Sequence, residues 1–359
     1  MSGQVRVKLF PETSGEVLRS GGLSATLFPY HTGVVGLRLA NERGFVEVLP
    51  WLGGMVWQGV FDGVSLAMRS AFDAPRAAAG IAGTYGCFAF HSGVLANGVP
   101  AAEDEHPAHG EMPVARMDRA FLVADGVACL RVVSECEYAM GFGAHYLARS
   151  SVTLRAGSAR FDIGLSVQNL SGKPMELMYM CHINPAWVPG ARIVQPVPFD
   201  TAHMELRRAI PAHVVPTPQF RARMEMLATQ PEKLAVLEQP ALCDPEQVYY
   251  LHDLPVDAQG HTHALLRRPQ GDGIAISHAP AQFPQTVRWL FHDPDHGVAA
   301  IALPSTCYPE GRAAARRRGQ IRVLAPNETA EFTVRAGYLN AAATASMEKT
   351  IAALTGEGA

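Results

Sequence analysis

The sequence has no hydrophobic run long enough to cross a membrane and no marked excess of charge of one sign. A helix needs about 18 consecutive apolar residues to span a bilayer, and no such run occurs among the 359 residues. The formal net charge is −3, and charged residues make up only 18% of the chain. No basic surface is therefore expected to bind nucleic acid or an anionic membrane.

Motifs for nucleotide cofactors and for secretion are also missing. No Gly-x-Gly-x-x-Gly follows an expected strand, and the sequence contains no Walker-type loop. These are the usual phosphate-binding motifs, so we predict no cofactor. The first ten residues lack the apolar core of a signal peptide, which favours a cytoplasmic location.

The six cysteines include no Cys-x-x-Cys pair and are scattered, mostly within apolar runs. This distribution favours buried, reduced thiols of a cytoplasmic protein over disulfides or a zinc site. They are Cys87, Cys129, Cys136, Cys181, Cys243 and Cys307.

Short apolar runs separated by turn residues fill most of the chain and predict an all-β fold. Strands about every 8 to 12 residues are typical of a sandwich or barrel rather than of alternating strands and helices. Such runs include 45–49, 146–154, 159–168, 175–183 and 298–303. Since no repeat or low-complexity linker divides the chain, we predict a single β-sandwich domain over residues 1–359.

Two hairpins and two helices are also predicted. Asp125-Gly126 between apolar runs indicates a hairpin turn, and residues 320–324 and 330–334 are expected to pair as the last hairpin. A helix is expected near 220–227. A second helix over 341–354 carries its apolar residues on one stripe.

Residues 103–113 form a segment rich in side chains that can exchange protons. Two histidines and four carboxylates lie within eleven residues, and two prolines and Gly110 exclude a helix. If the backbone runs extended here, His109 and Glu111 point to the same side. A solvated acidic turn would explain the composition equally well, but a second histidine-bearing segment favours a functional interpretation.

That second segment is residues 175–185. In a strand, Met178, Met180, His182 and Asn184 share one face, while the alternate residues form an apolar face. The first face changes from apolar to polar toward its end. This pattern predicts a strand that crosses the core and emerges into a cleft at His182.

Two further polar residues lie at the ends of expected strands. His91 ends an apolar run, and Asp253 ends the strand expected over 248–253, where His252 points to the opposite side. A lone histidine on such a run is more often hydrogen-bonded inside the core than bound to a ligand. This alternative stays open for both His91 and His182.

Taken in order, these motifs resemble the aldose 1-epimerase (galactose mutarotase-like) superfamily, and more closely its branch labelled DUF4432. The resemblance covers about residues 40 to 338. It rests on Leu49-Pro50, the segment from Tyr85 to His91, residues 103–113, Tyr179-x-x-His182-x-Asn184, and Phe283-Pro284 followed by Trp289.

The resemblance implies an antiparallel β-supersandwich that binds a sugar on its concave face and interconverts the sugar's α and β anomers. An acid protonates the ring oxygen, and a base removes the proton of the anomeric hydroxyl. His182 lies at the position of the acid, and His109 at that of a sugar-contacting histidine. Asp253 is a looser match to an aspartate that holds sugar hydroxyls, and we add His91, Glu111 and Asn184 to the expected sugar contacts.

One position departs from the family pattern. The family's base is a glutamate just after the late apolar strand, where this sequence has Pro304. Proline cannot accept a proton, so another carboxylate must act. We expect Glu310 to be the base, acting with His182, and keep Glu111 as a second candidate.

Two other functions fit the same residues. A sugar-binding protein would keep the cleft without the chemistry, as the missing glutamate would allow. A metal-dependent sugar isomerase could use nitrogen and oxygen ligands from His91, His106, His109, Glu111 and His182. In each case the partner is a small sugar whose identity the sequence leaves open, and the exposed sheet edges of such a sandwich would suit a homodimer.

Overall fold

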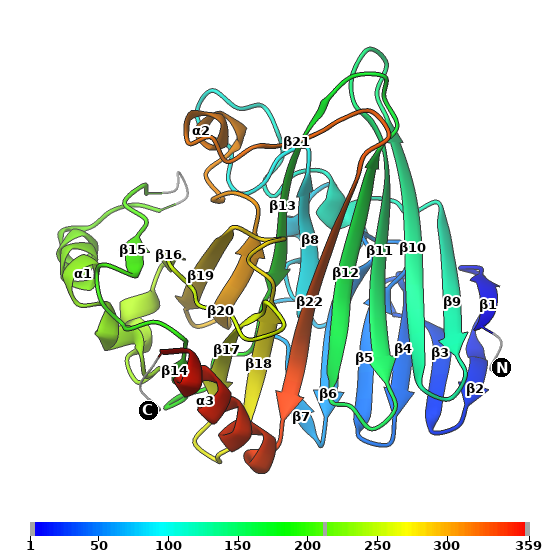
Figure 1. Ribbon diagram of the computed structural model, residues 1–359, viewed down its shortest axis with the longest axis horizontal. Coiled ribbons are helices and arrows are strands. Elements are labelled where there is room, and N and C mark those ends of the chain that lie inside the picture. Colours follow the sequence, from blue (N-terminus) through cyan, green and yellow to red (C-terminus); the bar gives the residue numbers. More distant parts are fainter. Residues whose placement is uncertain (1–3, 211–213, 356–359) are drawn as a thin grey trace.

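The computed structural model of the protein describes residues 4–210 and 214–355. Its described part contains two large antiparallel sheets that pack face to face, with three α-helices outside them (Figure 1). The helices are α1 (Pro218–Thr229), α2 (Arg312–Arg317) and α3 (Ala341–Thr355). None of these described helices is both long and apolar enough to cross a membrane.

The first sheet contains nine strands in the described chain. Their spatial order is β1 (Gln4–Leu9), β9 (Arg119–Asp125), β10 (Cys129–Ala139), β11 (His145–Arg155), β12 (Arg160–Asn169), β22 (Thr329–Leu339), β18 (Gly273–His278), β17 (Thr262–Arg267) and β14 (Arg192–Val194). Side chains of β11 and β22 alternate between buried and more exposed positions. At these strands one face of the sheet therefore packs on the core while the other meets solvent, whereas every residue of β18 is buried.

The second sheet contains thirteen strands in the described chain. Its main order is β15 (Met204–Leu206), β16 (Gln247–Leu251), β19 (Gln285–His292), β20 (Gly297–Ser305), β13 (Met175–Ile183), β8 (Ala89–Val94), β6 (Met55–Phe61), β5 (Gly44–Leu49), β4 (Val35–Asn41), β3 (Leu23–Pro29) and β2 (Gly15–Ser20). The short strands β7 (Val64–Ser65) and β21 (Arg322–Leu324) attach to β6 and β13.

Several strands of the second sheet are buried on both faces. Every residue of β16, β20 and β8 is buried. A sheet packed against a core on one side only would leave alternate residues exposed. Other parts of the chain must therefore cover the outer face of these strands, and they enclose the cavity described below.

Most of the predicted elements are confirmed. The hairpin at Asp125-Gly126 joins β9 to β10, and the C-terminal helix is α3. The helix predicted near residue 220 is α1, which begins after Thr217, whose side chain accepts a hydrogen bond from the Phe220 amide at 3.1 Å. Such a cap satisfies one of the free amides at a helix start.

The predicted hairpin between 320–324 and 330–334 is wrong. β21 pairs with β13, whereas β22 pairs with β12 and β18, so the intervening turn crosses from one sheet to the other. Asn169 holds this crossing, because its Nδ2 donates to the carbonyls of Leu324 and Ala325 at 3.1 and 3.2 Å. The local turn pattern is present, but the strand partners are set by residues far away in the chain.

Gly53, in the turn after β5, is a point of close backbone approach. Its φ is 62°, and a Cβ placed there would lie 2.2 Å from the carbonyl oxygen of Pro113. The Gly53 amide donates to the carbonyl of Ala115 at 2.7 Å. The turn after β5 is thereby fixed to the end of the segment 103–113.

We expect Gly53→Ala to lower the free energy of unfolding by about 2–4 kcal/mol, because it adds a steric clash to the strain of a positive φ. Gly63→Ala is the matched control. Gly63 also has a positive φ, 78°, but open space around it, so its loss should be only about 1–2 kcal/mol. Denaturant unfolding measures both, and equal losses would contradict the close contact.

Candidate functional site

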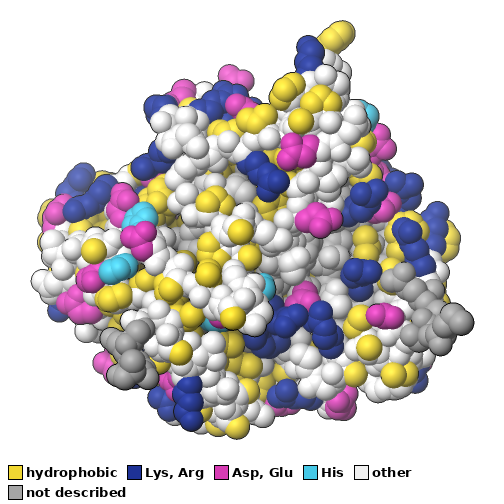
Figure 2. Space-filling view, viewed as in Figure 1, with side chains coloured by type: hydrophobic (Ala, Val, Ile, Leu, Met, Phe, Trp, Pro, Cys, Tyr) yellow, Lys and Arg dark blue, Asp and Glu magenta, His cyan; other side chains and the backbone are white. Residues whose placement is uncertain are grey.

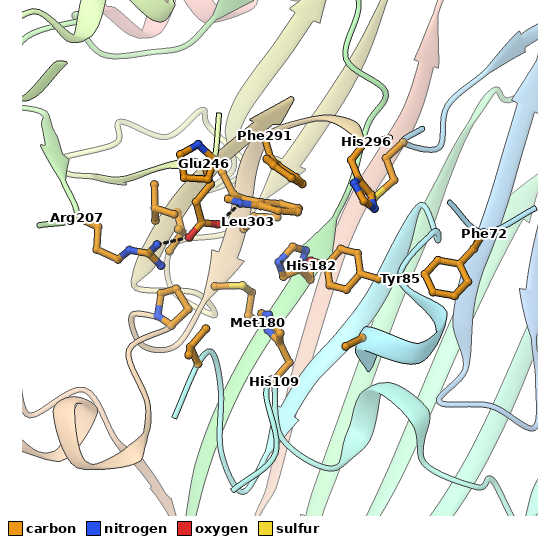
Figure 3. Close-up of a pocket in the computed structure, with 18 residues that line it drawn as sticks. Phe72, Tyr85, His109, Met180, His182, Arg207, Glu246, Phe291, His296 and Leu303 are labelled. Atoms are coloured by element: carbon orange, nitrogen blue, oxygen red, sulfur yellow. Dashed lines mark hydrogen bonds and ion pairs between the residues drawn. The ribbon is translucent and has the colours of Figure 1, made fainter. Parts of the chain in front are cut away.

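A cavity of about 320 Å³ lies on the outer face of the second sheet, over β16, β19, β20 and β13 (Figure 3). The strands supply an apolar floor in which His182 is the main polar group. The loops supply the remaining walls, with aromatic rings on one side and charged groups on the other. Residues from the strands are Val248, Val287, Trp289, Phe291, Leu303, Met180 and His182; those from the loops include Phe72, Tyr85, His109, Arg207, Glu246 and His296.

The faces predicted for β13 are confirmed. Met180 and His182 line the cavity, whereas Tyr179 points toward the other sheet, where its ring centroid lies 4.8 Å from that of Phe332 of β22. Pairing with β8 places Phe90 opposite His182. The two rings stack nearly parallel, with 4.5 Å between their centroids.

His182 is held in one tautomer by Asn184. The Asn184 Nδ2 donates to the Cys87 carbonyl at 3.1 Å, so its Oδ1 is the atom that faces the imidazole. His182 Nδ1–H therefore donates to Asn184 Oδ1 at 2.8 Å. The other nitrogen, Nε2, is left as an acceptor, and the Tyr85 hydroxyl lies 3.3 Å from it.

Burial keeps His182 neutral. It removes water from the ring and so lowers the pKa of His182 well below 6.5, and the neighbouring His109 lowers it further, while the hydrogen bond to Asn184 acts in the opposite direction. Burial also raises the pKa of the Tyr85 phenol well above its ordinary value. At neutral pH the cavity floor therefore presents an uncharged imidazole and an uncharged phenol.

His109 is fixed in the same way by a different set of residues. Ser92 donates its hydroxyl proton to Asn97 Oδ1 at 2.5 Å, and the Asn97 Nδ2 donates to Ser305 Oγ at 3.3 Å. Ser92 Oγ can therefore only accept from His109 Nδ1–H, which lies 2.9 Å away. Since burial lowers the pKa of His109 to about 4, its Nε2 is also a neutral acceptor.

Residues 109–111 do not run extended, so the condition under which His109 and Glu111 would point to the same side is not met. His109 and Gly110 have φ values of 63° and 76°, in the left-handed region. The His109 amide donates to the Gly98 carbonyl at 2.8 Å, and its carbonyl accepts from the Gly93 amide at 2.9 Å. This loop turns His109 into the cavity, where its ring centroid lies 5.0 Å from that of His182.

Glu111 points away from His109 and supports the loop. Its Oε1 accepts hydrogen bonds from the amides of Val94 and Leu95 at 2.9 and 3.0 Å and from the Tyr146 hydroxyl at 2.7 Å. This carboxylate therefore satisfies two backbone amides and one phenol, which is a structural role. It is not among the residues that line the cavity.

His91 and Asp253 also lie away from the cavity. His91 is next to Phe90 on β8, so it faces the core, where Nδ1 lies 2.9 Å from the Tyr179 hydroxyl. The strand expected over 248–253 ends at Leu251, and Asp253 follows it with a φ of 53°. Asp253 lines two other hollows, one of them beside α3.

Glu310 lies next to a cavity residue, Pro309, but does not itself line the cavity. Its Oε1 accepts from the Tyr250 hydroxyl at 2.9 Å, and its Oε2 accepts from Arg318 Nε at 3.1 Å. Pro304 lies in β20, opposite Thr286 of β19. Both carboxylate oxygens of Glu310 therefore already accept hydrogen bonds, one from Tyr250 and one from Arg318.

Glu246 is the one carboxylate among the described residues that line the cavity, and sequence reasoning missed it. It forms an ion pair with Arg207, and its Oε2 accepts from Trp289 Nε1 at 2.6 Å. Trp289 and Tyr85 occur in the motifs that carry the family resemblance, so the sequence held a signal for them. Arg207 and Glu246 flank short strands in no recognisable pattern.

Of the four histidines and Glu111 suggested above as metal ligands, only His109 and His182 come together in the cavity. His91 faces the core, Glu111 faces the amides of β8, and His106 Nδ1 lies 2.8 Å from the Pro107 carbonyl. Within residues 4–210 and 214–355, no three His, Cys, Asp or Glu side chains form a group able to hold a metal ion.

A family model described as domain of unknown function (DUF4432) matches residues 31–337. No curated protein sequence matches the chain significantly.

Solved structures share the fold at low sequence identity. A "putative aldose 1-epimerase" from Klebsiella pneumoniae is 16% identical with a TM-score of 0.78, over 99% of this chain and 97% of that one. A galactose mutarotase-like protein from Clostridium acetobutylicum is 14% identical with a TM-score of 0.58, over 89% and 99%. A second "putative aldose 1-epimerase", from Escherichia coli K12, is 17% identical with a TM-score of 0.53, over 94% of this chain and 99% of that one. The fold is therefore galactose mutarotase-like.

Burial of His91 predicts a loss of stability in acid. Burial lowers the pKa of His91 to about 4, so between pH 6.5 and 4 the unfolded chain binds a proton that the folded chain does not. The free energy of unfolding should fall through this interval by ~1.4 kcal/mol per pH unit for this group.

His91→Gln keeps a hydrogen-bonding partner for Tyr179 and should reduce the loss between pH 7 and pH 4.5 by about 2 kcal/mol. Urea unfolding at the two pH values measures it. His31→Gln is the control for removing a histidine, because the side chain of His31 is 67% exposed. An unchanged acid sensitivity in His91→Gln would contradict the prediction.

Proposed function

Because the chain belongs to the family described as domain of unknown function DUF4432, and has a galactose mutarotase-like fold, we propose that it is a carbohydrate-active isomerase. The proposed reaction is the aldose 1-epimerase-like interconversion of the α and β anomers of a sugar. The observation that carries the proposal is the pair of neutral imidazoles, His182 and His109, at the floor of the cavity.

The cavity suits a monosaccharide in size and in chemistry. Its volume of about 320 Å³ lies at the lower end of the range of small-molecule sites. Aromatic rings of Tyr85, Trp289 and Phe291 offer flat apolar surfaces for the carbon–hydrogen faces of a sugar ring. The two Nε2 atoms and the Tyr85 hydroxyl offer partners for its hydroxyl groups.

In the proposed reaction His182 acts first as a base. Its Nε2 accepts the proton of the anomeric hydroxyl O1, the bond between C1 and the ring oxygen O5 breaks, and the resulting imidazolium gives the proton to O5. Both oxygens are bonded to C1, so one nitrogen can reach each in turn. The aldehyde then rotates about the C1–C2 bond, and the reverse proton transfers close the ring on its other face.

His109 and Asn184 support this step. His109 Nε2 accepts a hydrogen bond from a neighbouring sugar hydroxyl and so orients the ring. Asn184 acts through His182, because it holds Nδ1–H and favours the imidazolium that forms during the reaction. This role for Asn184 is to position and stabilise the base rather than to contact the sugar.

The sequence resemblance gives His182 the role of acid, and Glu310 is the carboxylate expected to replace the family's missing base. We instead propose the base role for His182, since its ring is neutral at rest and the Glu310 carboxylate is bonded to Tyr250 and Arg318 outside the cavity lining. The two assignments differ in what each variant should do.

His182→Gln should lower the rate of anomer exchange by about 10² to 10⁴-fold, because it removes the proton-transfer group while its amide can still bond Asn184. Glu310→Gln is the matched carboxylate control and should keep the rate within about twofold of wild type. Proton NMR exchange between anomers of a panel of aldoses measures both, with a thermal melt to verify folding. A large loss in Glu310→Gln would restore Glu310 as the base.

The pH dependence tests the protonation state of His182. Since its pKa lies well below 6.5, the base form persists as the pH falls, and kcat/KM should be flat from pH 8 to pH 6.5 and decline only in more acidic solution. A profile measured by the same exchange from pH 4 to 8 shows this. A rate that rises on acidification through pH 6.5 would indicate an imidazolium acid instead.

A second candidate is a sugar-binding protein without turnover. The observation that favours it is the state of Glu246, whose two oxygens are already bonded to Arg207 and Trp289, so the cavity wall offers no free carboxylate as a second proton-transfer group. Line broadening of a sugar in the same NMR experiment, with no exchange between its anomers, would support this function. A chelator and added manganese in parallel samples would detect a dependence on metal.

A further inference from the structure

A second cluster of reactive side chains lies on the outer face of the nine-stranded sheet, away from the sheet that carries His182, and its His263 and Ser277 are 8% and 6% exposed. It surrounds a cavity of about 270 Å³. Acidic, basic and histidine side chains are interspersed on the face shown in Figure 2. The cavity residues used below are Asp257, His263, Ser277, Arg160 and Arg335.

Strand pairing brings these residues together. His263 of β17 lies directly opposite Ser277 of β18, and Ser277 lies opposite Arg335 of β22. Arg160 begins β12, the next strand of the sheet. Asp257 precedes β17 in a tight turn, where its Oδ1 accepts the amide of His261 at 2.9 Å.

The hydrogen bonds in the cluster form a chain with one direction. Asp257 Oδ2 lies 3.0 Å from His263 Nε2, and an ionised carboxylate only accepts, so Nε2 carries the proton. His263 Nδ1 is then the acceptor for the Ser277 hydroxyl at 2.8 Å. Arg160 Nη2 donates to the same Ser277 oxygen at 2.7 Å.

The charge states agree with that direction. Burial alone would raise the pKa of Asp257, but hydrogen bonds from the His261 amide, the His263 ring and the Gln259 amide outweigh it and lower that pKa. Burial lowers the pKa of His263, an effect that Asp257 partly offsets. The imidazole is therefore a neutral base beside a serine hydroxyl at neutral pH.

We propose that Ser277, His263 and Asp257 form a nucleophilic site that hydrolyses small esters, separate from the sugar cavity. A hydroxyl bonded to a histidine, whose other nitrogen is oriented by a carboxylate, is the geometry by which a serine nucleophile is recognised. Arg160 adds a cation on the serine oxygen, where negative charge develops as the proton leaves.

In the proposed reaction Ser277 Oγ bonds to the ester carbonyl carbon while its proton passes to His263 Nδ1. The carbonyl electron pair moves onto oxygen beside Arg160 and then reforms the carbonyl as the alkoxide leaves with the proton from His263. Water attacks the acyl-serine in the same manner, giving its proton to His263. The products are a carboxylic acid and an alcohol, and Ser277 is regenerated.

The substrate class follows from the cavity. At about 270 Å³ it holds a short acyl group rather than a lipid chain. Asp162 neutralises Arg155 and Arg335 by ion pairs at 2.7 Å with each, whereas no described acidic side chain pairs with Arg160. Small esters with an electron-rich or anionic acyl group should therefore be preferred.

The test uses the full-length protein with a tagged fluorophosphonate, which reacts with activated serines, and with p-nitrophenyl acetate. We expect labelling that mass spectrometry maps to Ser277, and ester hydrolysis that falls by about 10² to 10⁴-fold in Ser277→Ala and at least about tenfold in His263→Gln. Ser151→Ala, on the solvent face of the same sheet without a histidine partner in the described structure, should match wild type.

Wild-type protein that is not labelled at Ser277, or hydrolysis that is equal in wild type and Ser277→Ala, would overturn the proposal and leave a hydrogen-bonded network that holds the turn before β17. If Ser277→Ala fails to fold, the mapped label on wild type and the His263→Gln rate decide the question. Anomer exchange should be unchanged in Ser277→Ala, so the two proposed activities succeed or fail independently.

Discussion

The hydrogen bond from His182 Nδ1 to Asn184 is the interaction on which the candidate site depends. An imidazole can be buried at low cost only if its polar atoms find partners. Asn184 satisfies one nitrogen and is itself oriented by the Cys87 carbonyl. In His109, Nδ1 is satisfied by Ser92, which is in turn oriented by Asn97. In both rings Nδ1 is satisfied by the protein, while Nε2 faces the cavity, where that of His182 has the Tyr85 hydroxyl 3.3 Å away.

The architecture around these rings follows from strands that are buried on both faces. β20 and β8 have no exposed residue, so their outer face needs a cover, and segments distant in the chain provide it. The loop with Tyr85, the loop with His109 and the turn before β16 with Glu246 all converge on this face. A cavity between a flat sheet and several independent loops can change its lining without changing the sheet, because loops tolerate substitution more readily than the strands that they cover.

Local periodicity predicted what depends on local geometry. The alternation along residues 175–183 places Met180 and His182 on one face and the core residues on the other, and the structure confirms it. Local periodicity could not predict contacts between segments that are distant in the chain. The bend at His109 is set by backbone bonds to Gly93 and Gly98, and the partners of β21 and β22 are set at Asn169. Glu246 reaches the cavity only because β16 pairs with β19.

The protonation state of His182 has an electrostatic explanation. An unpaired carboxylate beside an imidazole favours the charged form and raises its pKa, whereas burial without one lowers it. The sequence resemblance expects a glutamate where Pro304 lies in β20, and the carboxylate that does line the cavity, Glu246, is bonded to Arg207 and Trp289. Burial therefore dominates at His182. Because the one carboxylate in the described cavity lining is bonded to other side chains, His182 is neutral at rest, which is the state required for the base role proposed for it.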